Sequence, residues 1–67
     1  MTIGKLIKVL AVTEDVSITD LAKRTGISRQ GLYKRLDHGI EFEAVQEIFG
    51  ILGYDLYYGK DGEIHKI

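Results

Sequence analysis

Hydrophobic residues recur with a helical period over the first 52 residues and alternate in the short tail that follows. Near the N-terminus, four apolar side chains fall at i, i+3, i+4 and i+7: Ile3, Leu6, Ile7 and Leu10. This stripe is typical of a helix that rests on a core, and it predicts a first helix over residues 3–12 with Thr2 as its cap. Residues 13–15 are polar and end the pattern.

The next stretch predicts two short helices joined by a tight turn, over about 18–24 and 28–36. Ser17 precedes the first helix and has an acid three residues later, the spacing of a capping box, while Ser28 is placed to cap the second. Gly26 lies where the chain must reverse, a position that favours glycine. Apolar residues at matching positions point into one shared core: Leu21, Ala22, Ile27, Leu32 and Leu36. Helix, glycine-containing turn and helix is the arrangement of a helix-turn-helix.

A fourth helix is predicted over 42–52, followed by Gly53 as its C-terminal cap and Tyr54 in apolar contact with the helix. We expect one apolar face on this helix, made by Phe42, Val45, Ile48, Phe49 and Leu52. Gly50 is unexpected in a helix interior, where glycine costs about 1 kcal/mol relative to alanine. Close contact with another backbone would explain it.

The tail predicts a β-hairpin over 54–67, because Asp61-Gly62 is a strong type I′ turn signal. With strands near 55–59 and 63–67, Tyr58 pairs with His65. An isolated two-stranded hairpin is marginal, so this one must pack on the helices or pair with a second copy. We expect its apolar residues to form a dimer interface: Leu56, Tyr57, Tyr58, Ile64 and Ile67.

The length of the chain suits one small domain. The patterns above predict a mostly α-helical fold with four helices and a C-terminal hairpin. The chain has 67 residues, no Cys and no Pro, so no disulfide or thiolate metal site can support the core. No apolar run reaches the roughly 20 residues of a membrane span, and the N-terminus lacks signal-peptide order. We therefore expect a cytoplasmic protein.

Charge is distributed unevenly although the net charge is only −1. Between residues 23 and 35 there are five basic residues and no acidic one: Lys23, Arg24, Arg29, Lys34 and Arg35. From Asp37 onward there are seven acids against two lysines. Such an asymmetry predicts one positive face that could lie on DNA, although a charge cluster on a helix is also commonly just a solvated face.

The second helix of a helix-turn-helix enters the major groove, where its outward residues meet base edges. Its outward positions here are Ser28, Arg29, Gln30, Tyr33 and Lys34. Arginine can pair with guanine and glutamine with adenine, so we expect these five residues to contact bases. Contacts to backbone phosphates are expected from Thr19, Lys23 and Arg35. The simpler interpretation is a three-helix packing motif with a polar outer face.

The segments LAKRTGISRQGLYKRL and ILGYDLYY resemble the phage-repressor family of Cro-like (xenobiotic-response-element) helix-turn-helix proteins. They are especially similar to the small antidote repressors of toxin–antitoxin modules, and the likeness covers residues 3–58. It implies a homodimeric repressor that reads an operator with the second helix of the motif. Two features depart from the family pattern: Gly31 within that helix, and a hairpin in place of the usual fifth helix.

No arrangement of residues in the sequence predicts catalysis, a metal or a cofactor. His38 and His65 lack metal-ligand spacing, and Ser28 has no His–acid partner pattern. The second functional hypothesis is a protein-interaction module whose acidic C-terminal half binds a toxin or a polymerase subunit. Dimerisation through the hairpin and dimerisation through the helix over 42–52 are both compatible with the sequence.

Overall fold

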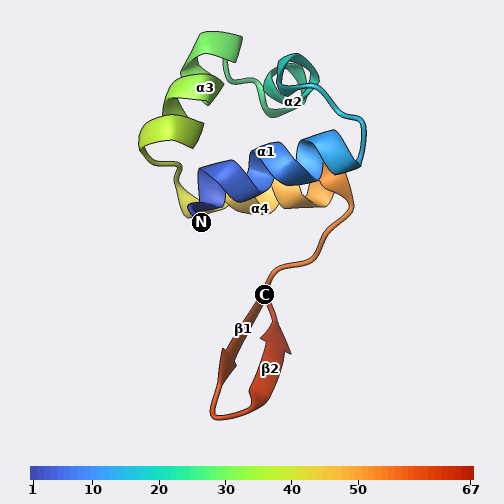
Figure 1. The fold of residues 1–67 in the computed structure, drawn as a ribbon, viewed down its shortest axis with the longest axis vertical. Coiled ribbons are helices and arrows are strands. Elements are labelled where there is room, and N and C mark those ends of the chain that lie inside the picture. The colour runs from blue at the N-terminus through green and yellow to red at the C-terminus, as the bar shows by residue number, and fades with distance from the viewer.

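In a computed structural model that describes all residues 1–67, four helices are followed by a two-stranded antiparallel hairpin. The elements are α1 (Ile3–Thr13), α2 (Ile18–Thr25), α3 (Arg29–His38), α4 (Phe42–Leu52), β1 (Tyr57–Lys60) and β2 (Glu63–Lys66). Helices α1 and α4 form one layer, α2 and α3 cover one side of it, and the hairpin extends from the other side (Figure 1). The predicted order of four helices and a hairpin is confirmed.

Three of the four helices, α1, α2 and α3, begin at the hydroxyl caps that the sequence predicted. Thr2, Ser17 and Ser28 each accept a hydrogen bond from the backbone N–H three residues later, at 3.2, 3.0 and 3.0 Å. Gly53 ends α4 in the left-handed conformation, and the N–H of the next residue, Tyr54, donates to the Phe49 carbonyl at 2.8 Å. These bonds satisfy backbone groups that a helix end would otherwise leave unpaired.

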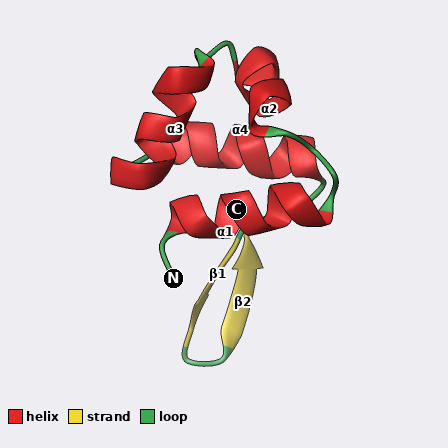
Figure 2. Cartoon of the chain, turned by 45° about the horizontal axis from the view of Figure 1, so that its top comes forward, coloured by secondary structure: helices red, strands yellow, loops and turns green.

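All four helices contribute to one apolar core. The side chains that are fully buried are Ile7, Leu21, Leu32 and Ile48, one from each helix. Leu36 is also buried, whereas Ile27 packs against the core with part of its surface exposed. Burying one such side chain contributes about 1.5–3 kcal/mol, so this cluster is the main source of stability. Figure 2 shows α1 and α4 side by side beneath the helix-turn-helix.

Gly4 has a role that its helix propensity does not suggest. It is buried where α1 crosses α3, and a Cβ atom there would overlap the carbonyl oxygen of Leu36. The missing side chain lets the two helices approach closely. In sequence, Gly4 is only a residue that weakens the first turn of a helix.

Three details differ from the prediction. Helix α3 continues to His38, two residues further than expected, and the Lys8 ammonium of α1 holds the Asp37 carboxylate of its last turn at 2.7 Å. Strand β1 begins at Tyr57, because the residues before it form the connection to the helical body. The apolar face expected for α4 is buried at Val45, Ile48, Phe49 and Leu52, whereas Phe42 at the start of the helix is 53% exposed.

The hairpin has the predicted register. Tyr58 lies opposite His65, and their rings stack with centroids 5.2 Å apart. The Ile67 N–H donates to the Leu56 carbonyl at 2.8 Å, which extends the expected pairing beyond the strands. Asp61 and Gly62 both have positive φ angles, 53° and 83°, as a type I′ turn requires.

None of the helices combines the length and the apolar character that crossing a membrane would require.

Candidate nucleic-acid interface

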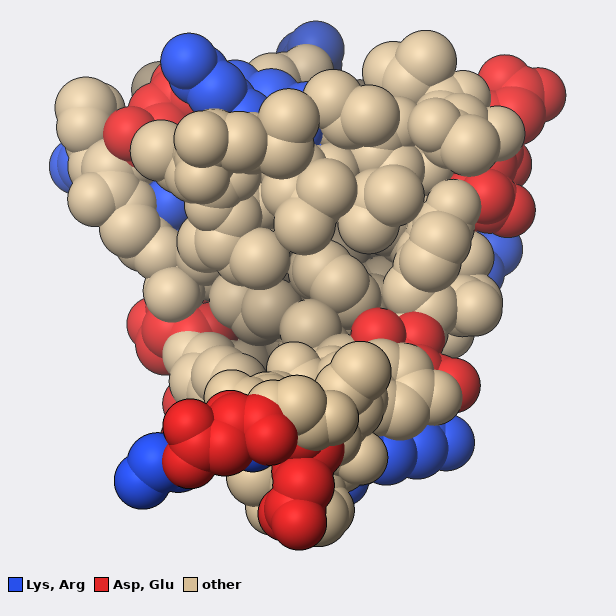
Figure 3. Space-filling model, turned by 60° about the horizontal axis from the view of Figure 1, so that its bottom comes forward, with Lys and Arg blue, Asp and Glu red and all other residues tan.

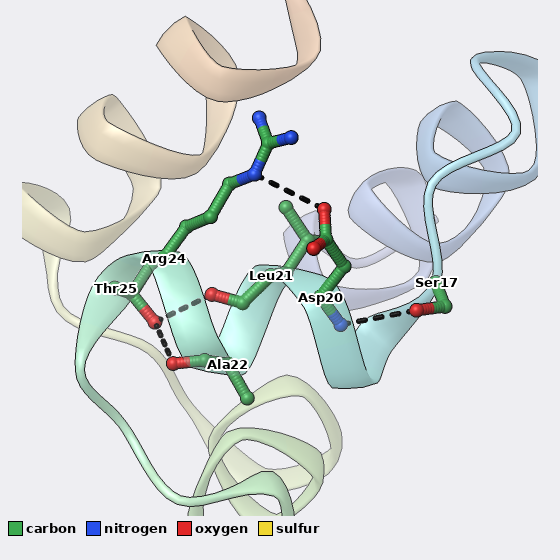
Figure 4. Close-up of polar contacts among 6 residues, drawn as sticks. All are labelled: Ser17, Asp20, Leu21, Ala22, Arg24 and Thr25. Carbon is green, nitrogen blue, oxygen red and sulfur yellow. Dashed lines mark hydrogen bonds and ion pairs between the residues drawn. The ribbon is translucent and has the colours of Figure 1, made fainter.

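The turn between α2 and α3 is closed by local hydrogen bonds. The Thr25 hydroxyl donates to the carbonyls of Leu21 and Ala22 at 2.8 and 3.2 Å (Figure 4). Gly26 follows in the left-handed conformation with φ 74°, and the Ile27 N–H returns to the Ala22 carbonyl. Ala22 itself is buried, so its small side chain allows α2 and α3 to pack together. The two short helices and the tight turn that the sequence predicts between them are therefore present.

Helix α3 has clearly separated faces. Leu32 and Leu36 point into the core, and four of the predicted base-contacting residues are exposed: Arg29, Gln30, Tyr33 and Lys34. The fifth, Ser28, uses its hydroxyl oxygen to cap α3 by accepting from the Gly31 N–H at 3.0 Å. Its hydroxyl hydrogen can still be donated to a ligand. The first two turns of the exposed face of α3 carry no acid.

Arg29 and Tyr33 lie one turn apart on this face and contact each other. The Arg29 guanidinium carbon is 5.6 Å from the centre of the Tyr33 ring, the geometry of a cation–π pair. At an exposed site such a pair contributes about 0.5–1 kcal/mol. It holds the guanidinium against a rigid ring and restricts the rotamers of both side chains, so the two residues form one unit of the surface.

Two of the five predicted cations are already paired within the protein. Arg24 binds Asp20 at 3.1 Å (Figure 4), and Arg35 binds Glu41 at 3.3 Å. The capping box is consequently half formed, because Ser17 caps α2 while the Asp20 carboxylate turns to Arg24. Lys23, Arg29 and Lys34 remain without an ion pair in the chain; they are the cations that a phosphate could bind without competition.

The residues predicted to contact phosphates differ in their surroundings. Thr19 and Lys23 are exposed on α2, whereas Arg35 is half-exposed and bound to Glu41. An exposed pair contributes at most about 1 kcal/mol, so a phosphate can replace the carboxylate. Helical spacing could not predict this pairing, because Glu41 lies in the connection beyond the end of α3.

Gly31 makes room within α3 itself. A Cβ atom there would lie 2.8 Å from the Ser28 hydroxyl oxygen and 3.2 Å from a terminal nitrogen of Arg35. The absence of a side chain therefore leaves space for the cap of α3 and for the Arg35 guanidinium. These two neighbours account for a glycine at this position without reference to a ligand.

Two polar contacts that the sequence did not predict hold this scaffold together. Lys8 donates a hydrogen bond to Asp37, and that bond together with the lysine charge lowers the pKa of the Asp37 carboxyl. The Tyr54 hydroxyl donates to the Glu14 carboxylate at 2.7 Å, which raises the pKa of Tyr54. Both join residues far apart in sequence, so they brace α3 and the end of α4 against α1.

The predicted dimer residues are largely uncovered. Tyr57, Tyr58, Ile64 and Ile67 are exposed, and only Leu56 packs partly against the core. The structure therefore leaves the hairpin available for a contact outside the chain. No three His, Asp or Glu side chains are grouped closely enough to hold a metal ion.

No family model matches the chain, and neither the curated proteins nor the solved structures include a match to it. The function therefore rests on the geometry and chemistry of α2, α3 and the hairpin.

Proposed function

We propose that the protein is a sequence-specific DNA-binding regulator of the Cro-like helix-turn-helix type, a dimeric repressor that reads a pseudo-palindromic operator through the major groove. One observation carries this proposal. The outward face of the first two turns of α3 presents Arg29, Gln30, Tyr33 and Lys34, and no carboxylate lies among them. Acidic side chains near the N-terminus stabilise a helix, so helix stability does not explain their absence from this face.

The chemistry of these side chains fits base edges. Arg29 can donate two hydrogen bonds to O6 and N7 of guanine, and Gln30 can pair with N6 and N7 of adenine. The cation–π contact with Tyr33 reduces the freedom that Arg29 would lose on binding, which lowers the entropic cost of recognition. Lys23, exposed on α2, has no internal partner and is available for a phosphate.

A dimer supplies the additional base contacts that a single domain lacks. A single recognition helix makes few base contacts, and two helices placed about 34 Å apart can read successive major grooves on one side of the duplex. The exposed apolar hairpin supports such a dimer, because an isolated two-stranded hairpin needs additional packing to be stable.

The test begins by selecting preferred duplexes from a random pool and then measures affinity at several salt concentrations. We expect Arg29→Ala to lose about 1–3 kcal/mol on the selected site and to reduce discrimination against mutated sites. We expect Lys23→Ala to weaken all duplexes similarly and to lower the salt slope by about 1.

Lys60→Ala is the matched control, because Lys60 is an exposed hairpin lysine that also has no ion pair in the chain. It should leave site discrimination unchanged. If no duplex is enriched, or if binding does not weaken with salt, the DNA-binding proposal is wrong. The acidic C-terminal half would then point to the alternative, a protein-interaction module.

A further inference from the structure

The helical body has a second unusual surface, on the side from which the hairpin extends. Seen from that side, its middle is a broad area without Lys, Arg, Asp or Glu, and charged side chains lie around the margin (Figure 3). Helix α3 contacts the opposite flank of α1 through Gly4 and Lys8. The uncharged surface is therefore formed by the sides of α1 and α4 that face away from α3.

Six residues define this surface, which we call the α1/α4 face: Ile3, Leu6 and Leu10 of α1, and Phe42, Gln46 and Gly50 of α4. The α1 residues are spaced i, i+3 and i+7, and the α4 residues i, i+4 and i+8, so each set forms one stripe along its helix. All six are exposed or half-exposed. Gln46 and Gly50 also line a shallow hollow that continues to Leu56 and Ile67 at the base of the hairpin.

Gly50 is the least explained residue of the α1/α4 face. It lies inside α4, where glycine is unfavourable, yet a Cβ atom there would meet nothing within 4 Å. Within the single chain, an alanine would fit without strain. Gly4 and Gly31, the other glycines inside helices, both have a neighbouring atom within 3.0 Å of where a Cβ atom would lie. A surface that approaches α4 from outside the chain would give Gly50 the same role.

The hairpin has the complementary property, because it exposes apolar groups that no helix covers. Tyr57 and Ile64 share one of its faces, and Ile64 is 74% exposed. The segment that joins the hairpin to its own helices has defined contacts. It is held by the Tyr54–Glu14 hydrogen bond, by the packing of Leu56 on the core, and by the Lys66–Asp55 ion pair at 3.2 Å.

We propose that two copies of the chain exchange hairpins, so that the hairpin of each copy packs on the α1/α4 face of the other. This inference rests on the dimer in the proposed function and is independent of DNA binding. It commits to one occupant of the face, a second copy of this chain. In a symmetric pair, each copy uses the same two patches, and both exposed apolar surfaces are covered at once.

Interface size favours this arrangement over contact between hairpins alone. Standard interfaces use roughly 20–30 residues a side, whereas the two strands of the hairpin contain four residues each. Adding the α1/α4 face brings each copy towards the size of a stable interface.

The exchange also separates the two helix-turn-helix units. The molecule is 39 Å long, with the helix-turn-helix near one end and the hairpin at the other (Figure 1). A two-fold axis perpendicular to this length puts the two helix-turn-helix units at opposite ends of the dimer, as reading two half-sites requires.

The experiment measures self-association of the full chain by sedimentation equilibrium. Gly50→Gln places a side chain on the α1/α4 face, and Ile64→Gln replaces an apolar group of the hairpin. We expect each variant to raise the dimer dissociation constant at least tenfold. Glu47→Gln, an exposed position of α4 outside the face, should leave the constant unchanged. Thermal unfolding of the dissociated Gly50→Gln chain should be no lower than that of the wild type, because glutamine favours a helix more than glycine does.

Mixing the two weakened variants is the decisive step. A mixed dimer contains one unaltered hairpin on one unaltered face, so an equimolar mixture should associate more tightly than either variant alone. Dimers closed only by hairpin–hairpin contact would show no such recovery. A monomeric wild type, an unaffected Gly50→Gln dimer, or a mixture without recovery would each overturn the exchange. Retention of selective DNA binding in any of these cases would leave the DNA-binding part of the proposed function standing.

Discussion

The helical body and the hairpin are stabilised in different ways. Every buried residue of the chain lies between Gly4 and Leu52, and every strand residue of the hairpin is exposed. The body therefore depends on apolar burial shared among four helices. The hairpin depends on a favourable turn, its backbone hydrogen bonds and a few side-chain contacts. The body can therefore be understood from one chain, whereas the exposed apolar residues of the hairpin are explained only by the proposed contact with a second copy.

Truncating one apolar residue in each region should give the largest difference. Leu32→Ala removes a fully buried side chain and should lower the free energy of unfolding by about 2–5 kcal/mol. Ile64→Ala, at an exposed position of the hairpin, should change the unfolding of the dissociated chain by less than about 0.5 kcal/mol. Urea denaturation at low protein concentration measures both. Similar losses of unfolding free energy at the two positions would contradict this difference between the helical body and the hairpin.

Glycine substitutions should separate contacts within the chain from contacts outside it. Gly4→Ala forces α1 away from the Leu36 carbonyl and should cost about 1–3 kcal/mol. Gly50→Ala adds a methyl group in open space and should stabilise the dissociated chain by about 1 kcal/mol. Thermal unfolding of both variants provides the comparison. If the Gly50→Ala monomer is less stable than the wild type, the space around Gly50 is not open within the single chain.

The Tyr54–Glu14 hydrogen bond should make the body sensitive to alkaline pH. Because the folded state raises the pKa of Tyr54, the bond stabilises the fold below the unfolded pKa, and this contribution is lost as the pH rises through the folded pKa. Unfolding should therefore be followed from neutral pH to beyond about pH 10. Tyr54→Phe should show a smaller alkaline decrease, with Tyr57→Phe as a control outside the body.

The Lys8–Asp37 pair should give the smallest effect, since both side chains are exposed. The folded state lowers the pKa of Asp37, so the pair stabilises the fold above the unfolded pKa and loses this contribution as the pH falls through the folded one. Asp37→Asn should flatten the decrease in stability below about pH 4. If the stability of Asp37→Asn falls with decreasing pH as steeply as that of the wild type, the Lys8–Asp37 pair does not help to hold α3 on α1.

Local signals in the sequence predicted most of the fold. Ser17 and Ser28 cap their helices, Gly26 and Gly53 end theirs, and Asp61-Gly62 forms the turn with the expected register. These features depend on backbone conformation over a few neighbouring residues, which residue type largely determines. The outward residues of α3 were predictable for the same reason, since Leu32 and Leu36 orient the whole helix.

Side-chain partners across elements could not be predicted in this way. The pairing of Arg35 with Glu41 changes which cations are available to a phosphate, and neither spacing nor composition indicated it. The exposure of Phe42 is likewise not specified by the periodicity of α4.

The sequence alone determined the helices, their caps, the turn of the hairpin and the acid-free outer face of α3, because each follows from short-range geometry and helical spacing. Only the tertiary structure decided that Gly4 is a helix-crossing site, that Gly50 faces open space, and that the hairpin extends away from an uncharged α1/α4 face. These properties depend on distances between elements, and the packing of side chains in three dimensions sets those distances.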